Sequence, residues 1–111
     1  MNRGMSKGKL CHGGHVLVVD DDYAVCELIT ARLSNEGYDC ESCAGAAQAF
    51  DIMERFPFNV VILDLMMPGL TGLELLKVAR KKYPWTSFLI ITGMDDPQLK
   101  QQAMDQGAVT C

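Results

Sequence analysis

Oxygen-bearing side chains end three separate apolar runs in this sequence. The runs and the polar residues that end them are 16–19 with Asp20 and Asp21, 60–63 with Asp64, and 88–91 with Thr92. Short uninterrupted apolar runs predict parallel strands that are covered on both faces. Because parallel strands bring their carboxyl ends to one edge of a sheet, we expect these four polar side chains to converge there.

Such a convergence predicts a cation-dependent site. Two carboxylates about 4 Å apart repel by on the order of 4 kcal/mol at an effective dielectric near 20. A cation is therefore expected among Asp20, Asp21 and Asp64, and oxygen ligands with room for water suit Mg²⁺ or Mn²⁺. Asp64 would then accept a phosphoryl group as an acyl phosphate, and Thr92 would hydrogen-bond a phosphoryl oxygen. Taken alone, Asp64 also fits the role of a cap or a solvated loop residue.

The segments between these runs are predicted to form helices and a further strand. Helices are expected at 23–36, 46–56, 72–83 and 97–107, and strands at 38–43 and from Val109 onward. Asp22 is the expected N-cap of the first helix and Gly37 its stop. Val25, Leu28, Ile29 and Leu33 are expected to form its inner stripe. Alternating strands and helices predict an α/β fold, a doubly wound parallel sheet with right-handed crossovers.

Length and composition place limits on the function. The chain has 111 residues, enough for one domain, and 49% hydrophobic with 22% charged residues is typical of a globular protein. No apolar stretch approaches a membrane span, and the N-terminus lacks a secretory pattern, so we expect a cytoplasmic protein without membrane contact. The net charge of −4 argues against direct nucleic-acid contact by this segment.

The N-terminal segment differs from the rest of the chain. Residues 1–14 contain four glycines and no periodicity, which predicts a flexible arm or a remnant of cloning, with the domain itself at 15–111. Cys11, His12 and His15 raise the alternative of a metal site, but the intervening glycines provide no rigid geometry.

Cys40 and Cys43 spell a C-x-x-C motif, which is compatible with a zinc or redox site. However, the motif falls in a predicted strand, where positions three apart face opposite sides of the sheet. No second C-x-x-C is present to complete four ligands. Packing is therefore the preferred interpretation of both cysteines.

Three motifs together resemble a known family. They are V-L-V-V-D-D-D at 16–22, L-D-L-M-M-P-G-L-T-G at 63–72 and I-I-T-G at 90–93. In this order and spacing they resemble the receiver domain of two-component response regulators, over about residue 15 to the end. The resemblance implies a flavodoxin-like (βα)5 architecture and a signalling phosphoacceptor rather than a metabolic enzyme.

The resemblance also implies roles for individual residues. Asp64 would be the phosphoacceptor, Asp21 a direct Mg²⁺ ligand, and Asp20 a ligand acting largely through water. Met66 would supply a backbone carbonyl to the metal, and Thr92 would be the switch hydroxyl. A sensor histidine kinase or a phosphotransfer protein would be the donor, and an output domain or partner would respond.

One feature of the family is absent. Its Lys at the end of the fifth strand would lie about three residues past Cys111, and Lys100 is on another element. The aromatic switch position would fall on Cys111 itself. We therefore expect the natural protein to be longer, and we expect the fourth strand's edge and an apolar surface to be exposed in this chain. If the protein instead ends at Cys111, we expect domain swapping or a homodimer through that edge.

Two other functions stay open at this point. A receiver-like interaction module that phosphate does not switch is compatible with the missing Lys. A doubly wound enzyme, such as an aspartate-based phosphatase or a nucleotide binder, would need a D-x-D or a glycine-rich loop. Asp64-Leu65-Met66 lacks the second Asp, and the first strand is followed by acids instead of glycines.

Overall fold

The computed structural model describes residues 14–65, 72–91 and 97–110, without the side chains of Leu99 and Thr110. Residues 1–13 of the predicted arm and the residues Met66, Thr92 and Cys111 lie outside these ranges. The elements are β1 (His15–Val19), α1 (Tyr23–Asn35), β2 (Asp39–Cys43), α2 (Ala46–Arg55), β3 (Val60–Asp64), α3 (Gly72–Lys82), β4 (Ser87–Ile91), α4 (Pro97–Asp105) and β5 (Val109–Thr110). All of the strand pairings are parallel, in the order β2-β1-β3-β4-β5. The predicted doubly wound sheet is confirmed.

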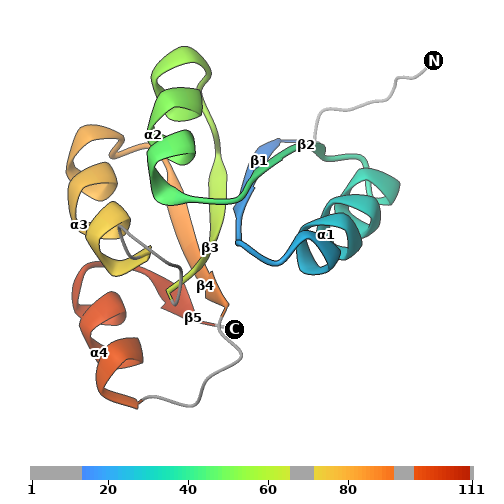
Figure 1. Ribbon diagram of the computed structural model, residues 1–111. Helices are drawn as coiled ribbons and strands as arrows, with labels where there is room; N and C mark the ends of the chain where they lie inside the picture. Colours follow the sequence, from blue (N-terminus) through green and yellow to red (C-terminus); the bar gives the residue numbers. More distant parts are fainter. Residues whose placement is uncertain (1–13, 66–71, 92–96, 111) are drawn as a thin grey trace.

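The sheet separates two apolar layers because successive strand residues point to opposite faces. Leu17, Val19, Val61 and Leu63 pack in a large cluster with α2, α3 and α4, whereas Val16, Val18 and Ile62 pack in a smaller cluster with α1. Figure 1 shows this asymmetry, with α1 on one side of the sheet and the other three described helices on the opposite side. The two strands β1 and β3 are buried on both faces over most of their length, as their apolar runs predict, whereas the outer strand β2 is mostly exposed.

Local signals set the helix ends. Asp22 caps α1, accepting hydrogen bonds from the backbone N–H groups of Ala24 and Val25. Gly37 follows the helix at a φ of 96°, a left-handed conformation that glycine adopts without strain. Both predictions are confirmed. On the opposite face of the sheet, α3 buries Leu75, Leu76 and Ala79 completely.

The predicted inner stripe of α1 is partly wrong. Leu28 is 72% exposed, and the buried residue of the helix is Cys26, while Val25, Ile29 and Leu33 are half-buried. The periodicity identifies the correct side of the helix, but α1 covers only part of its sheet face. An open apolar groove of about 590 Å³ remains, lined on the sheet side by Ile62, Leu89 and Ile91. The predicted exposed apolar surface is present in this groove.

The prediction for the edge of the fourth strand needs correction. β5 pairs with β4 through Leu89 with Val109 and Ile90 with Thr110, so the edge of β4 is covered at these two positions. The exposed strand is β5 itself, where Val109 is 61% exposed. Separately, no helix among the described residues is long and apolar enough to cross a membrane.

The two cysteines of the C-x-x-C motif face opposite sides of β2, as predicted. Cys40 packs against the α1-side cluster, and Cys43 packs against the large cluster on the other face. Both cysteines are free, so the packing interpretation is favoured over a paired redox or metal motif.

Candidate functional site

Three of the predicted site residues come together at the carboxyl edge of the sheet. Asp20 and Asp21 follow β1, and Asp64 is the last residue of β3, which pairs directly with β1. Each offers one carboxylate oxygen, and these oxygens all lie within 4.8 Å of one another. Asp64 lies opposite Ile91 in the register with β4, which extends β3 one residue beyond the predicted apolar run.

Asp20 is the buried member of this group, with 5% of its surface exposed. Its backbone N–H donates to the carbonyl of Cys43 at 3.1 Å, which ties the end of β1 to β2. Burial raises the pKa of the Asp20 carboxyl, and the nearby carboxylates of Asp64 and Asp21 raise it further. The opposing influence is a hydrogen bond of 2.9 Å from the backbone N–H of Asp22 to Oδ1 of Asp20. The folded chain therefore holds this negative charge against an electrostatic cost.

The loop after β1 also orients the acids. Asp22 uses its side chain as the cap of α1, so its carboxylate is engaged with the helix while its N–H holds Asp20. The thiol of Cys26, one turn into α1, donates to the carbonyl of Asp20 at 3.2 Å. The sequence analysis did not identify this role of Cys26. No local signal in the sequence indicates it, because the contact depends on how closely α1 approaches the end of β1.

Gly72 was predicted only to open a helix, but it also keeps the chain close to Asp64. A Cβ atom at position 72 would lie 2.2 Å from the carbonyl oxygen of Asp64 and 2.8 Å from Cα of Leu65. The N–H of Gly72 donates to the carbonyl of Leu65 at 3.3 Å. The start of α3 thus rests against the backbone that presents Asp64, which only a residue without a side chain allows.

The remaining predicted residues lie outside the described ranges. Met66 and Thr92 are both in segments that the structure does not describe, so their predicted roles stay predictions. β4 ends at Ile91, immediately before Thr92, and β3 ends at Asp64, two residues before Met66.

The donor set fits a hard divalent cation. All three candidate ligands are carboxylate oxygens, which suit Mg²⁺ or Mn²⁺. Two thiols lie beside the site, because Asp20, Asp21, Cys26 and Cys43 line one small cavity of about 200 Å³. Burial raises the pKa of both thiols, that of Cys43 to about 11, so neither offers a thiolate at neutral pH. The close approach of three mutually repelling carboxylates, of which that of Asp20 is buried, is the observation that indicates a cation.

Comparisons with known proteins agree with this geometry. The sequence profile of the response regulator receiver domain matches residues 16–111. A putative NtrX-like response regulator of Rickettsia felis is 35% identical over 95 residues, covering 84% of this chain and 20% of that protein. The transcriptional regulatory protein FixJ of Bradyrhizobium diazoefficiens is 35% identical over 96 residues, covering 86% of this chain and 47% of FixJ. The chain thus spans between a fifth and about half of the length of these relatives.

Solved structures show the same fold. A CheY-like response regulator receiver domain protein from Methanospirillum hungatei superposes with a TM-score of 0.84 at 30% identity, covering 88% of this chain and 78% of that one. The chemotaxis protein CheY4 of Vibrio cholerae superposes with a TM-score of 0.82 at 31% identity, covering 88% and 83% of the two chains. Both matches, like the sequence profile, extend over most of the sheet and its helices. The chain belongs to the response regulator receiver domains of two-component signalling systems.

Proposed function

We propose that Asp64 accepts a phosphoryl group from the phosphohistidine of a sensor histidine kinase or a phosphotransfer protein, in a reaction that depends on Mg²⁺. One observation carries this proposal. Carboxylate oxygens of Asp20, Asp21 and Asp64 lie within 4.8 Å of one another at the carboxyl ends of two adjacent parallel strands. A fold retains such repulsion when a cation and a phosphoryl group use it.

Asp64 is the best placed nucleophile of the three. It ends β3, a central strand of the sheet, and it is half-buried, whereas Asp20 is almost fully buried and Asp21 is exposed. An Asp64 carboxylate oxygen forms the new O–P bond while the P–N bond to the donor imidazole breaks. The electron pair of the broken bond stays on the imidazole nitrogen, which takes up a proton from water. The product is an aspartyl phosphate.

The other acids have the task of holding the metal. Asp21 and Asp64 would bind Mg²⁺ directly, Asp20 largely through water, and the backbone carbonyl of Met66 would complete the protein ligands. When bound, Mg²⁺ supplies positive charge that offsets the carboxylates and the phosphoryl oxygens. Within the protein, the N–H of Asp22 and the burial of Asp20 keep the ligand set pre-positioned.

The response to phosphorylation would be a population shift between two conformers. The new dianion adds charge-assisted hydrogen-bond acceptors beside Asp64, and the Thr92 hydroxyl would follow the phosphoryl group. Thr92 comes directly after β4, and α4 follows within a few residues, so the surface around α4 is the expected output region. The relatives' greater length is consistent with an output domain in a longer cytoplasmic protein.

Intact mass after incubation with acetyl phosphate tests the proposal. We expect a gain of about one phosphoryl group, roughly 80 Da, that needs Mg²⁺ and disappears in Asp64→Asn. Thr92→Ala should still be phosphorylated but should fail to shift its conformer population, as read from amide NMR shifts in α4. Absence of a mass gain both in this chain and in a version extended through the fifth strand would favour an interaction module that phosphate does not switch. A gain retained in Asp64→Asn would overturn the site.

A further inference from the structure

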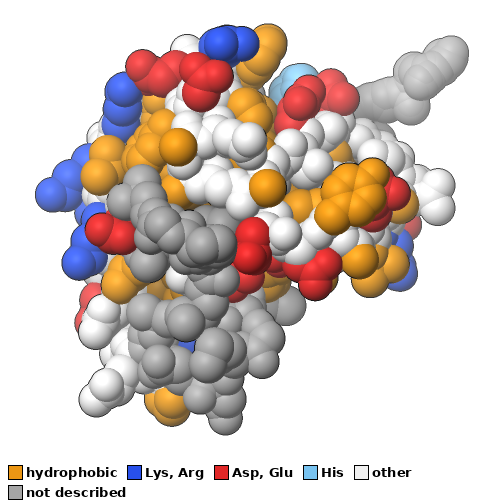
Figure 2. Space-filling view, viewed as in Figure 1, with side chains coloured by type: hydrophobic (Ala, Val, Ile, Leu, Met, Phe, Trp, Pro, Cys, Tyr) orange, Lys and Arg blue, Asp and Glu red, His pale blue; other side chains and the backbone are white. Residues whose placement is uncertain are grey.

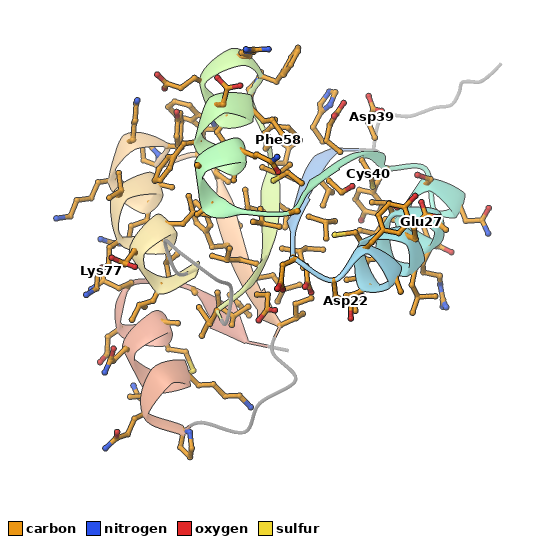
Figure 3. All side chains as sticks on the ribbon, in the orientation of Figure 1. Asp22, Glu27, Asp39, Cys40, Phe58 and Lys77 are labelled. Atoms are coloured by element: carbon orange, nitrogen blue, oxygen red, sulfur yellow. The ribbon has the colours of Figure 1, made fainter. Side chains whose placement is uncertain are left out.

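A second charged surface lies on α3, on the opposite side of the molecule from the acid-rich first third of the chain. Residues 14–43 contain seven acidic residues and one arginine, whereas residues 72–85 contain four cationic residues and one acid. Figure 2 shows the Lys and Arg side chains gathered along the outer side of α3. Figure 3 places Lys77 on this outer side, pointing away from the sheet, and Glu27 at the far side on α1. Cationic side chains are therefore concentrated on α3, with acidic side chains of α2 beside them.

We define the α3 basic face as Lys77, Val78, Lys81, Lys82 and Trp85. The first four share one side of the helix at three- and four-residue spacing, and all are exposed. Val78 is 54% exposed and Trp85, just after the helix, is 61% exposed. A large aromatic and an aliphatic side chain are thus presented to solvent among positive charges.

Side-chain contacts hold the base of this face together. Tyr83 is buried, and its hydroxyl donates to Oε2 of Glu54 at 2.6 Å. The ring of Trp85 packs edge-on against Tyr83 with the centroids 5.8 Å apart, and Lys82 Nζ lies 5.7 Å from the centroid of the same Tyr83 ring. Tryptophan and cationic residues are among those enriched in protein interfaces, and tryptophan is among the residues that dominate their binding energy.

Helix electrostatics account for only part of the face. Cations in the last turn stabilise the negative end of the helix dipole, which explains Lys81 and Lys82. Lys77 lies before that turn, and the exposure of Val78 and Trp85 has no electrostatic cause. Among the described residues, Lys82 forms an ion pair with Glu54 at 2.6 Å, while Lys77 and Lys81 form none.

We propose that the α3 basic face binds an acidic segment of a partner protein that carries an apolar side chain for Val78 and Trp85. Charge complementarity selects the acidic character, and the exposed apolar pair selects an amphipathic segment over a purely charged one. A short segment fits better than an extended polyanion such as a nucleic acid or an anionic membrane, because the α3 basic face has three cations, of which Lys82 is already paired with Glu54, on a chain of net charge −4. This interface is independent of the phosphoacceptor site.

Trp85 is the single tryptophan of the chain, so its emission reports on the face directly. The probe is a short synthetic amphipathic helix with Glu on one side and Leu on the other, free of Trp and Tyr. We expect a saturable change in Trp85 emission, with the affinity weakened by roughly tenfold or more in Lys81→Glu because like charges are brought together. Arg32→Glu makes the same charge change on α1 and should leave the affinity unaltered, and Asp64→Asn should bind like the wild type.

The proposal is overturned if the emission does not change, or if Arg32→Glu weakens binding as much as Lys81→Glu. Tighter saturable binding of a single-stranded oligonucleotide or of phosphatidylglycerol vesicles would also overturn it, in favour of a different anionic partner. An emission that depends on protein concentration without peptide, with a matching dimer in sedimentation, would identify a second copy of the chain as the occupant. Circular dichroism of each variant verifies that the fold is retained.

Discussion

The two edges of the sheet use acidic side chains in opposite ways. At the carboxyl edge, Asp20 and Asp64 lie near each other and near Asp21, so their charges add. At the amino edge, Glu54 accepts from Lys82 Nζ and from the Tyr83 hydroxyl, both at 2.6 Å, so its charge is compensated. The mutually repelling charges at the carboxyl edge are typical of a ligand-binding site, whereas the Glu54 contacts only join α2 to the end of α3. Local pairing, rather than the number of acids, distinguishes the two.

Hydrogen bonds to backbone carbonyls also differ between the two edges. Near the amino edge, Thr86 Oγ1 donates to the carbonyl of Phe58 at 2.7 Å and the N–H of Ser87 to Asn59 at 2.9 Å, which joins the loops before β3 and β4. Figure 3 shows Phe58 at this end of the sheet. At the carboxyl edge, Gly72 instead allows the start of α3 to lie against the carbonyl of Asp64. The close approach of α3 at that edge positions Asp64 through its backbone.

The largest expected effect is at Gly72. Gly72→Ala would place a Cβ 2.2 Å from the Asp64 carbonyl, and backbone cannot yield as a flexible side chain does. We expect a loss of about 3 kcal/mol in the free energy of unfolding, at the upper end for overpacking. Urea unfolding measures it. Gly45→Ala is the matched control, because nothing lies within 4 Å of a Cβ there, and it should cost less than about 1 kcal/mol. Equal losses in both variants would contradict the close approach.

In the absence of divalent metal, Asp20→Asn should increase the free energy of unfolding, whereas Gly72→Ala decreases it. The raised pKa means that the folded state favours the protonated carboxyl, so this favourable contribution is present at low pH and is lost as the pH rises through the folded pKa. At neutral pH the ionised Asp20 therefore destabilises the fold, and the neutral amide should stabilise it by about 1 kcal/mol.

The difference between wild type and Asp20→Asn should shrink as the pH falls, because the wild-type carboxyl then becomes neutral as well. Added Mg²⁺ should stabilise the wild type more than the variant, because a ligand that binds only the folded state raises its stability. Thermal unfolding across pH, with and without Mg²⁺, tests both statements. A variant less stable than wild type in chelator at neutral pH would contradict the account of this edge.

Glu54→Gln should give the smallest effect, a slight destabilisation at neutral pH. The hydrogen bonds from Lys82 and then Tyr83 lower the pKa of Glu54 from its ordinary 4.5. The stabilisation that results from this lowered pKa is present when the pH is above the ordinary pKa of Glu54, and it is lost as the pH falls through the lowered pKa. Because the pair is exposed, added salt should reduce the difference in melting temperature between wild type and variant. If Glu54→Gln were more stable than the wild type at neutral pH, the charge of Glu54 would not be compensated, and the two edges of the sheet would not differ in this respect.

Much of this fold could be predicted from the sequence because local signals agree with the tertiary structure. The strand at Val60 has an uninterrupted apolar run, Asp22 precedes a helix, and Gly37 follows one, and each has the predicted role. The prediction that Leu28 is buried was wrong, because helical periodicity gives the direction of a side chain and not the area of sheet available beneath it.

The proximity of three of the predicted site residues could be predicted for a similar reason, whereas Met66 and Thr92 lie outside the described residues. The convergence of Asp20, Asp21 and Asp64 follows from parallel topology alone. The contacts of Gly72 and Cys26 were not predictable, because they depend on how closely two helices approach the strand ends. Such distances are set by the whole core and have no local signal.

The central claim is that Asp64, and not its acidic neighbours, becomes phosphorylated. Borohydride reduces an aspartyl phosphate to homoserine, and trypsin separates the candidates, since the peptide 56–77 contains Asp64 as its only aspartate and the peptide 10–32 contains Asp20, Asp21 and Asp22. After acetyl phosphate, Mg²⁺ and borohydride, we predict homoserine at position 64 by tandem mass spectrometry and none in the peptide 10–32. Homoserine at position 20 or 21, with position 64 unmodified, would contradict the account.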